Sequence, residues 1–131
     1  MAKSISHMRP DKDRDRRIAS TVLAIIADGG IPATAAWHRH VSTTVFPFRA
    51  TYLSTHQTKP FCSSAIVLVV GLASTTDCKD GLLAKVIDGQ QTVRVPLELL
   101  RPYEETPSEV EPVLDWHYWV ARKGVIHHPQ I

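Results

Sequence analysis

The chain has 131 residues, 44% of them hydrophobic, which is enough for one domain with a single core. Its formal net charge of +2 is too small to indicate a polyanionic partner by itself. The longest apolar run, residues 65–73, falls well short of the roughly 20 residues that a membrane-spanning helix needs. Because the N-terminus has no secretory pattern and two cysteines make no disulfide framework, we expect a cytoplasmic protein.

The N-terminal part of the chain is predicted to be helical. Residues 1–10 are polar and aperiodic and are expected to be a disordered leader, followed by a single domain over residues 11–131. The spacing of Ile18, Val22 and Ile25 predicts a helix over residues 11–28 that begins near Asp11 or Asp13 and ends at Gly29. A short second helix is expected over residues 33–41.

Residues 43–103 form the predicted β-rich core, with strands at residues 43–54, 61–73, 82–88 and 91–96. The last two strands alternate in polarity on either side of Asp88 and Gly89, which predicts a β-hairpin. Pro96 cannot donate to a ladder and therefore ends the second strand. The leucines at positions 97, 99 and 100 then predict a helical or 3₁₀ turn.

This order of strand, tight turn, strand, proline and Leu-rich turn, within residues 81–103, resembles the last part of SH3-like small β-barrels. The resemblance implies a strongly bent antiparallel sheet or an SH3-like small barrel. We therefore expect an α+β fold with an N-terminal helix, this sheet or barrel, and a C-terminal helix packed on it.

The C-terminal helix is predicted over residues 109–123, with Ser108 at the cap and Arg122 in the last turn. Trp116, Tyr118 and Trp119 cannot all face one side of this helix. At least one aromatic side chain is then left for a partner, and these three residues are the predicted partner-binding site. The main hypothesis is therefore a non-enzymatic binding or adaptor module that acts through protein–protein contacts, including self-association as a homodimer.

A nucleic-acid-binding protein is the first alternative. It would use a basic face made of Arg39, Arg49, Arg94 and Arg101. Residues 34–42 also resemble the helix-turn-helix segment of bacterial regulators, but Pro47 would kink the recognition helix.

A small enzyme or a histidine-based metal protein is the second alternative. The sequence has no nucleotide-binding or hydrolase motif, and it predicts no catalytic residue, no cofactor and no membrane partner. Whether histidines bind a metal, and whether a cysteine is reactive, are left open. The residues concerned are His38, His40, His127, His128, Cys62 and Cys78.

Overall fold

The N-terminal helical segment changes its hydrogen-bond register in the middle. The computed structural model describes residues 11–29, 32–53, 65–78, 81–103 and 106–122, so the predicted leader lies outside them. Helix α1 (Lys12–Ile18) is capped by Asp11, whose carboxylate accepts a hydrogen bond from the backbone N–H of Arg14 at 3.0 Å. It continues through the π-helical turn η2 (Ala19–Leu23) into α2 (Ala24–Gly29). In this turn Thr21 donates its hydroxyl to the Arg17 carbonyl at 2.6 Å.

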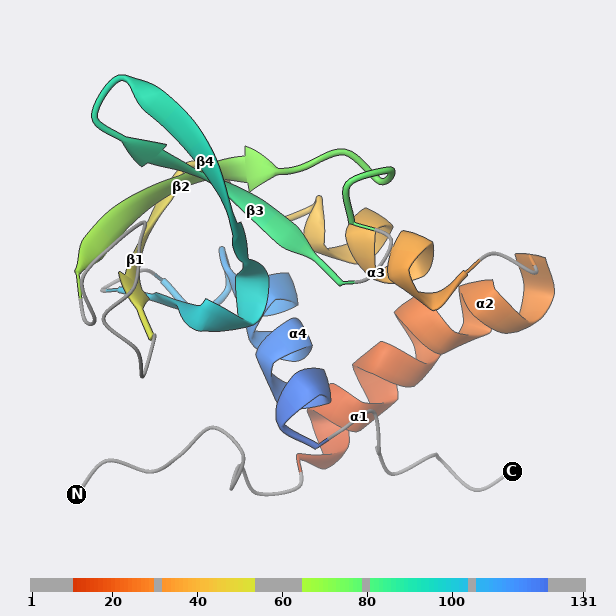
Figure 1. Cartoon of the computed structure of the whole chain (residues 1–131). Helices are drawn as coiled ribbons and strands as arrows, with labels where there is room; N and C mark the ends of the chain where they lie inside the picture. Colours follow the sequence, from red (N-terminus) through yellow and green to blue (C-terminus); the bar gives the residue numbers. More distant parts are fainter. Residues whose placement is uncertain (1–10, 30–31, 54–64, 79–80, 104–105, 123–131) are drawn as a thin grey trace.

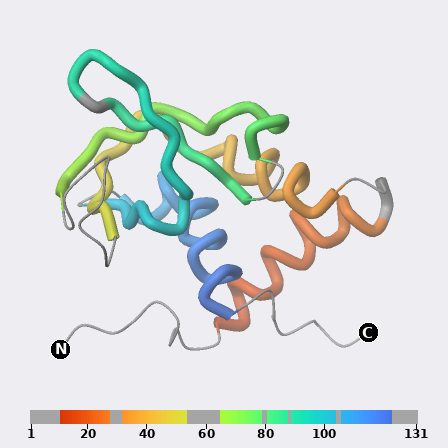
Figure 2. The backbone as a smooth tube through the Cα atoms, viewed as in Figure 1, coloured from red at the N-terminus to blue at the C-terminus, as the bar shows by residue number. Residues whose placement is uncertain are grey.

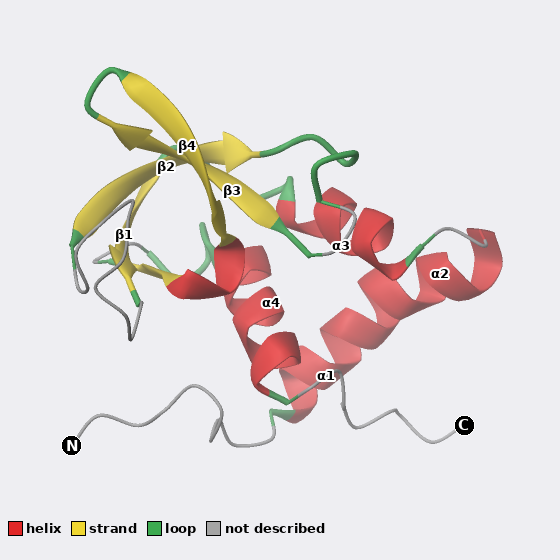
Figure 3. Cartoon of the chain, viewed as in Figure 1, coloured by secondary structure: helices red, strands yellow, loops and turns green. Residues whose placement is uncertain are grey.

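Helix α3 (Ala33–Val41) coincides with the predicted second helix. Helix α4 (Glu111–Ala121) begins two residues later than predicted, after Val110, and carries a proline in its first turn. All helices gather on one side of the sheet, and α1 crosses close to α4 (Figures 1 and 3). No helix among the described residues is long and apolar enough to cross a membrane.

Five antiparallel strands form an open sheet in the order β4-β3-β2-β1-β5. Their bounds are β1 (Phe48–Tyr52), β2 (Ile66–Leu72), β3 (Leu83–Asp88), β4 (Gln91–Pro96) and β5 (Leu100–Pro102). The predicted hairpin is confirmed: Asp88 pairs with Gln91, and Gly89 has a φ of 63°. The predicted 3₁₀ turn is also present, as η3 (Leu97–Leu99).

The expected α+β class is confirmed, but the expected SH3-like barrel is wrong. Closure would require the two edge strands, β4 and β5, to pair with each other, and they lie at opposite ends of the strand order. The path of the chain shows why, since η3 leads it away from β4 so that β5 adds to β1 at the other edge (Figure 2).

The core lies between one face of this sheet and the helices. Alternate strand residues such as Val69, Val86 and Val95 point into it, where they meet Trp37 of α3 and Tyr118 of α4. Because the helices cover only this face, the other face of the sheet carries the exposed residues of the alternation.

Candidate functional site

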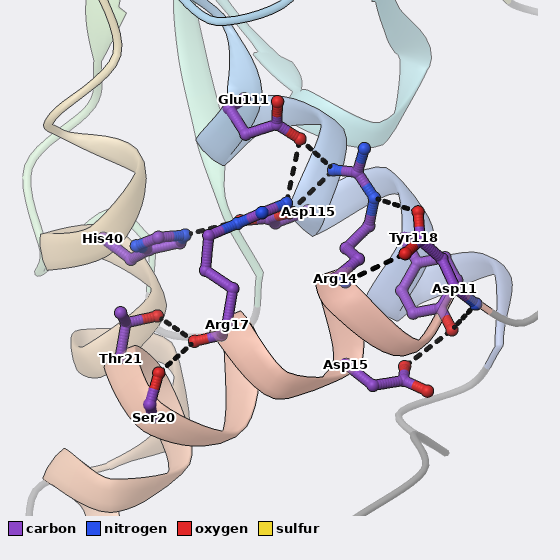
Figure 4. Close-up of polar contacts among 10 residues, drawn as sticks. All are labelled: Asp11, Arg14, Asp15, Arg17, Ser20, Thr21, His40, Glu111, Asp115 and Tyr118. Carbon is purple, nitrogen blue, oxygen red and sulfur yellow. Dashed lines mark hydrogen bonds and ion pairs between the residues drawn. The ribbon is translucent and has the colours of Figure 1, made fainter.

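A buried carboxylate joins the three helices. Asp115 of α4 has no solvent exposure. Its carboxylate accepts two hydrogen bonds from Arg17 of α1, from Nη2 at 2.6 Å and from Nε at 3.0 Å (Figure 4). Arg14 Nη1 lies 2.7 Å from the same carboxylate, and His40 Nε2 of α3 lies 2.8 Å from it. Glu111, one turn earlier on α4, lies 2.8 Å from both arginines. Three cationic or donor side chains therefore converge on one carboxylate.

A second polar contact ties α1 to α4. Tyr118 donates its hydroxyl to Asp15 Oδ1 at 2.6 Å and accepts the backbone N–H of Asp11 at 3.0 Å. Asp15 is fully buried, and its other oxygen accepts no hydrogen bond from the described residues. Burial and the bond donated to Asp15 raise the pKa of Tyr118, so the phenol stays protonated as the donor.

Opposing effects set the charge of Asp115. Burial alone would raise its pKa, but the hydrogen bonds from His40 and Arg17, with the positive charges of Arg17 and Arg14, lower it overall. The hydrogen bond to Asp115 raises the pKa of Arg17 in turn. The carboxylate is therefore ionised and its oxygens are already held by donors, so this cluster cannot coordinate a free cation without breaking the contact between helices.

A second pair of carboxylates lines a surface cavity of about 220 Å³. Its lining residues are Asp77, Gly81, Leu82, Leu83, Pro96 and Glu98. Asp77 follows β2, and its Oδ2 accepts Arg94 Nη1 at 2.9 Å. Glu98 lies in η3, and its Oε1 accepts the indole N–H of Trp116 at 3.1 Å. Among the described residues, no hydrogen bond reaches the second oxygen of either carboxylate.

This donor set suits a hard cation only in part. Calcium takes six to eight oxygen ligands, whereas Asp77 and Glu98 supply two carboxylates. Within the ranges that the structure describes, no three histidine, cysteine, aspartate or glutamate side chains gather as a metal-binding group. The described residues therefore do not make a complete calcium site.

The predicted partner-binding residues belong to the interior of the chain. Trp116 and Tyr118 are 7% and 1% exposed, and Trp119 is half-buried. The rings of Trp116 and Trp119 each lie with their centroids 5.3 Å from that of Trp37. Both the sheet and α1 pack on α4. They cover more of the circumference of α4 than packing against the sheet alone would cover.

The four predicted basic residues divide into two places. Arg49, Arg94 and Arg101 are exposed on strands β1, β4 and β5, whereas Arg39 is exposed on α3 and belongs to no strand. Arg49 also lies over the ring of Tyr103, 5.7 Å from its centroid.

The histidines that were left open as metal ligands have other partners. His38 Nε2 lies 2.7 Å from the carbonyl of Ala73, and His40 points to Asp115. His127, His128 and Cys62 lie outside the described residues. Cys78 is a buried free cysteine whose sulfur accepts the backbone N–H of Leu83 at 3.2 Å.

Sequence reasoning missed the cluster around Asp115. Arg14 and Arg17 have aspartates of their own helix nearby, and Arg14 does lie 3.7 Å from Asp11, so the sequence does not indicate that both reach another element. The available signal was the position of Asp115 between Val113 and Trp116, two buried residues of an apolar stripe. A carboxylate in that position requires a cationic partner from another element.

Comparisons with known proteins relate the chain to a family. A family model described as calcium binding, that of the CcbP proteins, matches residues 16–120. The solved structure "The crystal structure of Anabaena CcbP" has a TM-score of 0.72 and 22% identity, covering 89% of this chain and 96% of its own. "Calcium binding protein in the calcium-binding form" has a TM-score of 0.71 and 20% identity, covering 93% and 98%. A comparison with curated proteins found no match.

These findings correct the functional hypotheses drawn from the sequence. The matching family is one of calcium-binding proteins, so the self-associating adaptor module and the nucleic-acid-binding protein are both wrong. Both hypotheses interpreted side chains by type alone, while the aromatic residues of α4 pack inside the chain and the four arginines do not share one face.

Proposed function

Because the chain belongs to the calcium-binding CcbP family, we propose that it binds Ca²⁺ without acting as an enzyme. The observation that carries this proposal is the family match over residues 16–120, which spans the whole sheet and nearly all of α4. We also propose that the protein is cytoplasmic. Reducing conditions in the cytoplasm keep thiols such as that of Cys78 unpaired.

The cavity lined by Asp77 and Glu98 is the proposed location of the ion. Both carboxylates line it, and each has one oxygen without a hydrogen bond from the described residues. The arginine-filled cluster at Asp115 is a poorer place, since two guanidinium groups already balance its carboxylates. With only two carboxylates, we expect an affinity of about 10⁻⁴ to 10⁻³ M.

The test is a Ca²⁺ titration followed by calorimetry and by tryptophan fluorescence. Trp116 donates to Glu98, so an ion at this carboxylate should change the indole emission. Asp77→Asn and Glu98→Gln keep side-chain shape while removing charge, and each should weaken binding by about tenfold or more. The matched control is Asp13→Asn on α1, where the carboxylate is 87% exposed and does not line the cavity.

Arg94→Gln should act in the opposite direction. Arg94 competes for Asp77 through an ion pair of 2.9 Å, so its removal should strengthen Ca²⁺ binding several-fold. A wild-type protein with no Ca²⁺ heat at millimolar concentrations would overturn the proposed function. Binding that survives both carboxylate substitutions unchanged would retain the function and move its site away from this cavity.

A further inference from the structure

The face of the sheet that the helices leave open has an apolar centre. Ile66 and Leu68 of β2 and Ile87 of β3 are 52%, 39% and 38% exposed. Leu68 and Ile87 are direct partners in the ladder, so these side chains form one continuous patch on two neighbouring strands. Neighbouring strands rotate by only about 20–25°, which keeps a two-strand centre nearly flat.

Cations surround this centre. Arg49 pairs with Leu68 across the β1–β2 ladder, and Lys85 pairs with Arg94 across β3–β4. Arg101 of β5 lies opposite Thr51, which in turn lies opposite Ile66. The alternation places four basic side chains on this face from four different strands, while the described strand residues that share it include no carboxylate.

A polar hollow of about 400 Å³ adjoins the cations at one corner of the face. It is lined by Ala73, Ser74, Asp77, Lys85, Thr92 and Arg94. Lys85 and the hydroxyls of Ser74 and Thr92 are donors that a phosphate group takes, while Arg94 is shared with the Asp77 carboxylate at 2.9 Å.

From these contacts we infer that the open sheet face docks on an anionic lipid surface, such as one rich in phosphatidylserine. Aliphatic side chains within a ring of lysine and arginine match the apolar boundary and the negative headgroups of such a surface. The sequence predicted no membrane partner because it has no segment long enough to form a membrane-spanning helix. Docking on a lipid surface does not require a membrane-spanning helix.

The dimensions and charges favour lipid over the other occupants. Four strand spacings separate β5 from β4, roughly 19 Å, so an occupant must extend across all five strands to reach Arg101 and Arg94 together, as a lipid surface does. A second copy would bring like charges face to face. The exposed centre is aliphatic and offers no ring for stacking of nucleic-acid bases.

The test is co-sedimentation of the full chain with vesicles in EDTA, so that its outcome does not depend on Ca²⁺. Vesicles of phosphatidylcholine with about 30% phosphatidylserine should bind the protein, and pure phosphatidylcholine should not. The charge variant Lys85→Gln with Arg101→Gln should reduce partitioning by about tenfold or more. Its matched control is Arg16→Gln with Arg39→Gln, which removes the same net charge from exposed helical positions and should leave most of the binding.

A second variant tests the apolar centre. Ile66→Thr with Ile87→Thr keeps strand propensity at exposed positions and should also weaken partitioning, with an unchanged melting temperature as the check on folding. Absence of binding to anionic vesicles, or equal loss in the charge variant and its control, would overturn the inference. Retention on polyglutamate without vesicle binding would assign the face to an acidic protein, and a dimer sensitive to the threonine variant would assign it to a second copy; either result overturns lipid docking.

Discussion

Replacing Asp115 by asparagine should separate the three helices that its carboxylate holds. The substitution keeps the shape of the side chain but leaves Arg14, Arg17 and His40 without their shared anion. Loss of one partner from a buried ion pair costs about 3–5 kcal/mol. We expect about 3 kcal/mol, the lower end, because the two arginine side chains are 17% and 34% exposed and keep their contacts with Glu111.

The assay is urea unfolding at pH 7, followed by the fluorescence of the buried Trp37 and Trp116. A loss of this size corresponds to a fall in melting temperature of roughly 10 °C for a chain of this length. Asp13→Asn serves as the control, since its carboxylate lies 3.5 Å from Arg16 in an exposed pair and should contribute less than about 0.5 kcal/mol. A loss below about 1 kcal/mol for Asp115→Asn would refute the reasoning.

The pH dependence of the same variant gives an independent check. The pKa of Asp115 is lowered on folding, so its contribution is present above the unfolded value of about 3.9 and is lost as the pH falls through the folded value. Wild-type stability should therefore fall more steeply below about pH 4 than the stability of Asp115→Asn. Parallel curves in this acidic range would show that the carboxylate is not selectively stabilised by folding.

Two further substitutions test other parts of the fold. Burial lowers the pKa of His117, whose Nε2 lies 2.7 Å from the Leu100 carbonyl, so stability should decline as the pH falls below about 6.5. His117→Gln should show a smaller decline between about pH 7.5 and 5 in urea midpoints, and an equal decline would exclude this histidine as the cause. Gly89→Val should lower the free energy of unfolding by roughly 1 kcal/mol or more, because a φ of 63° strains a β-branched residue even though an added Cβ would meet no atom within 4 Å. An unchanged melting temperature would contradict this account of the turn.

The elements that sequence reasoning predicted well depend on neighbouring residues. The turn at Gly89, the end of β4 at Pro96 and helix α3 over Ala33–Val41 follow from local alternation, backbone freedom and helical propensity. Closure of the sheet was predicted wrongly because it depends on which edge receives β5, and nothing local to residues 100–102 specifies β1 as its partner.

The candidate sites were harder to predict for the same physical reason. Asp77 and Glu98 are separated by most of the hairpin, and only the packing of η3 beside the turn after β2 brings them to one cavity. Calcium ligands need no fixed sequence spacing when they come from separate elements. Arg17 and Asp115 are 98 residues apart, so the sequence showed a basic helix and an aromatic helix without showing that one neutralises the other.

The joining of α1 to α4 also determines when the molecule can be completed during its synthesis. Arg14, Arg17 and Asp15 leave the ribosome about 100 residues ahead of Asp115 and Tyr118. At about 5–20 residues per second, the first helix waits roughly 5–20 s for the partners that fix it. Until then Arg14, Arg17 and Asp15 lack the hydrogen bonds and ion pairs that α4 provides. A chain interrupted before α4 would therefore yield a product whose first helix lacks these polar contacts.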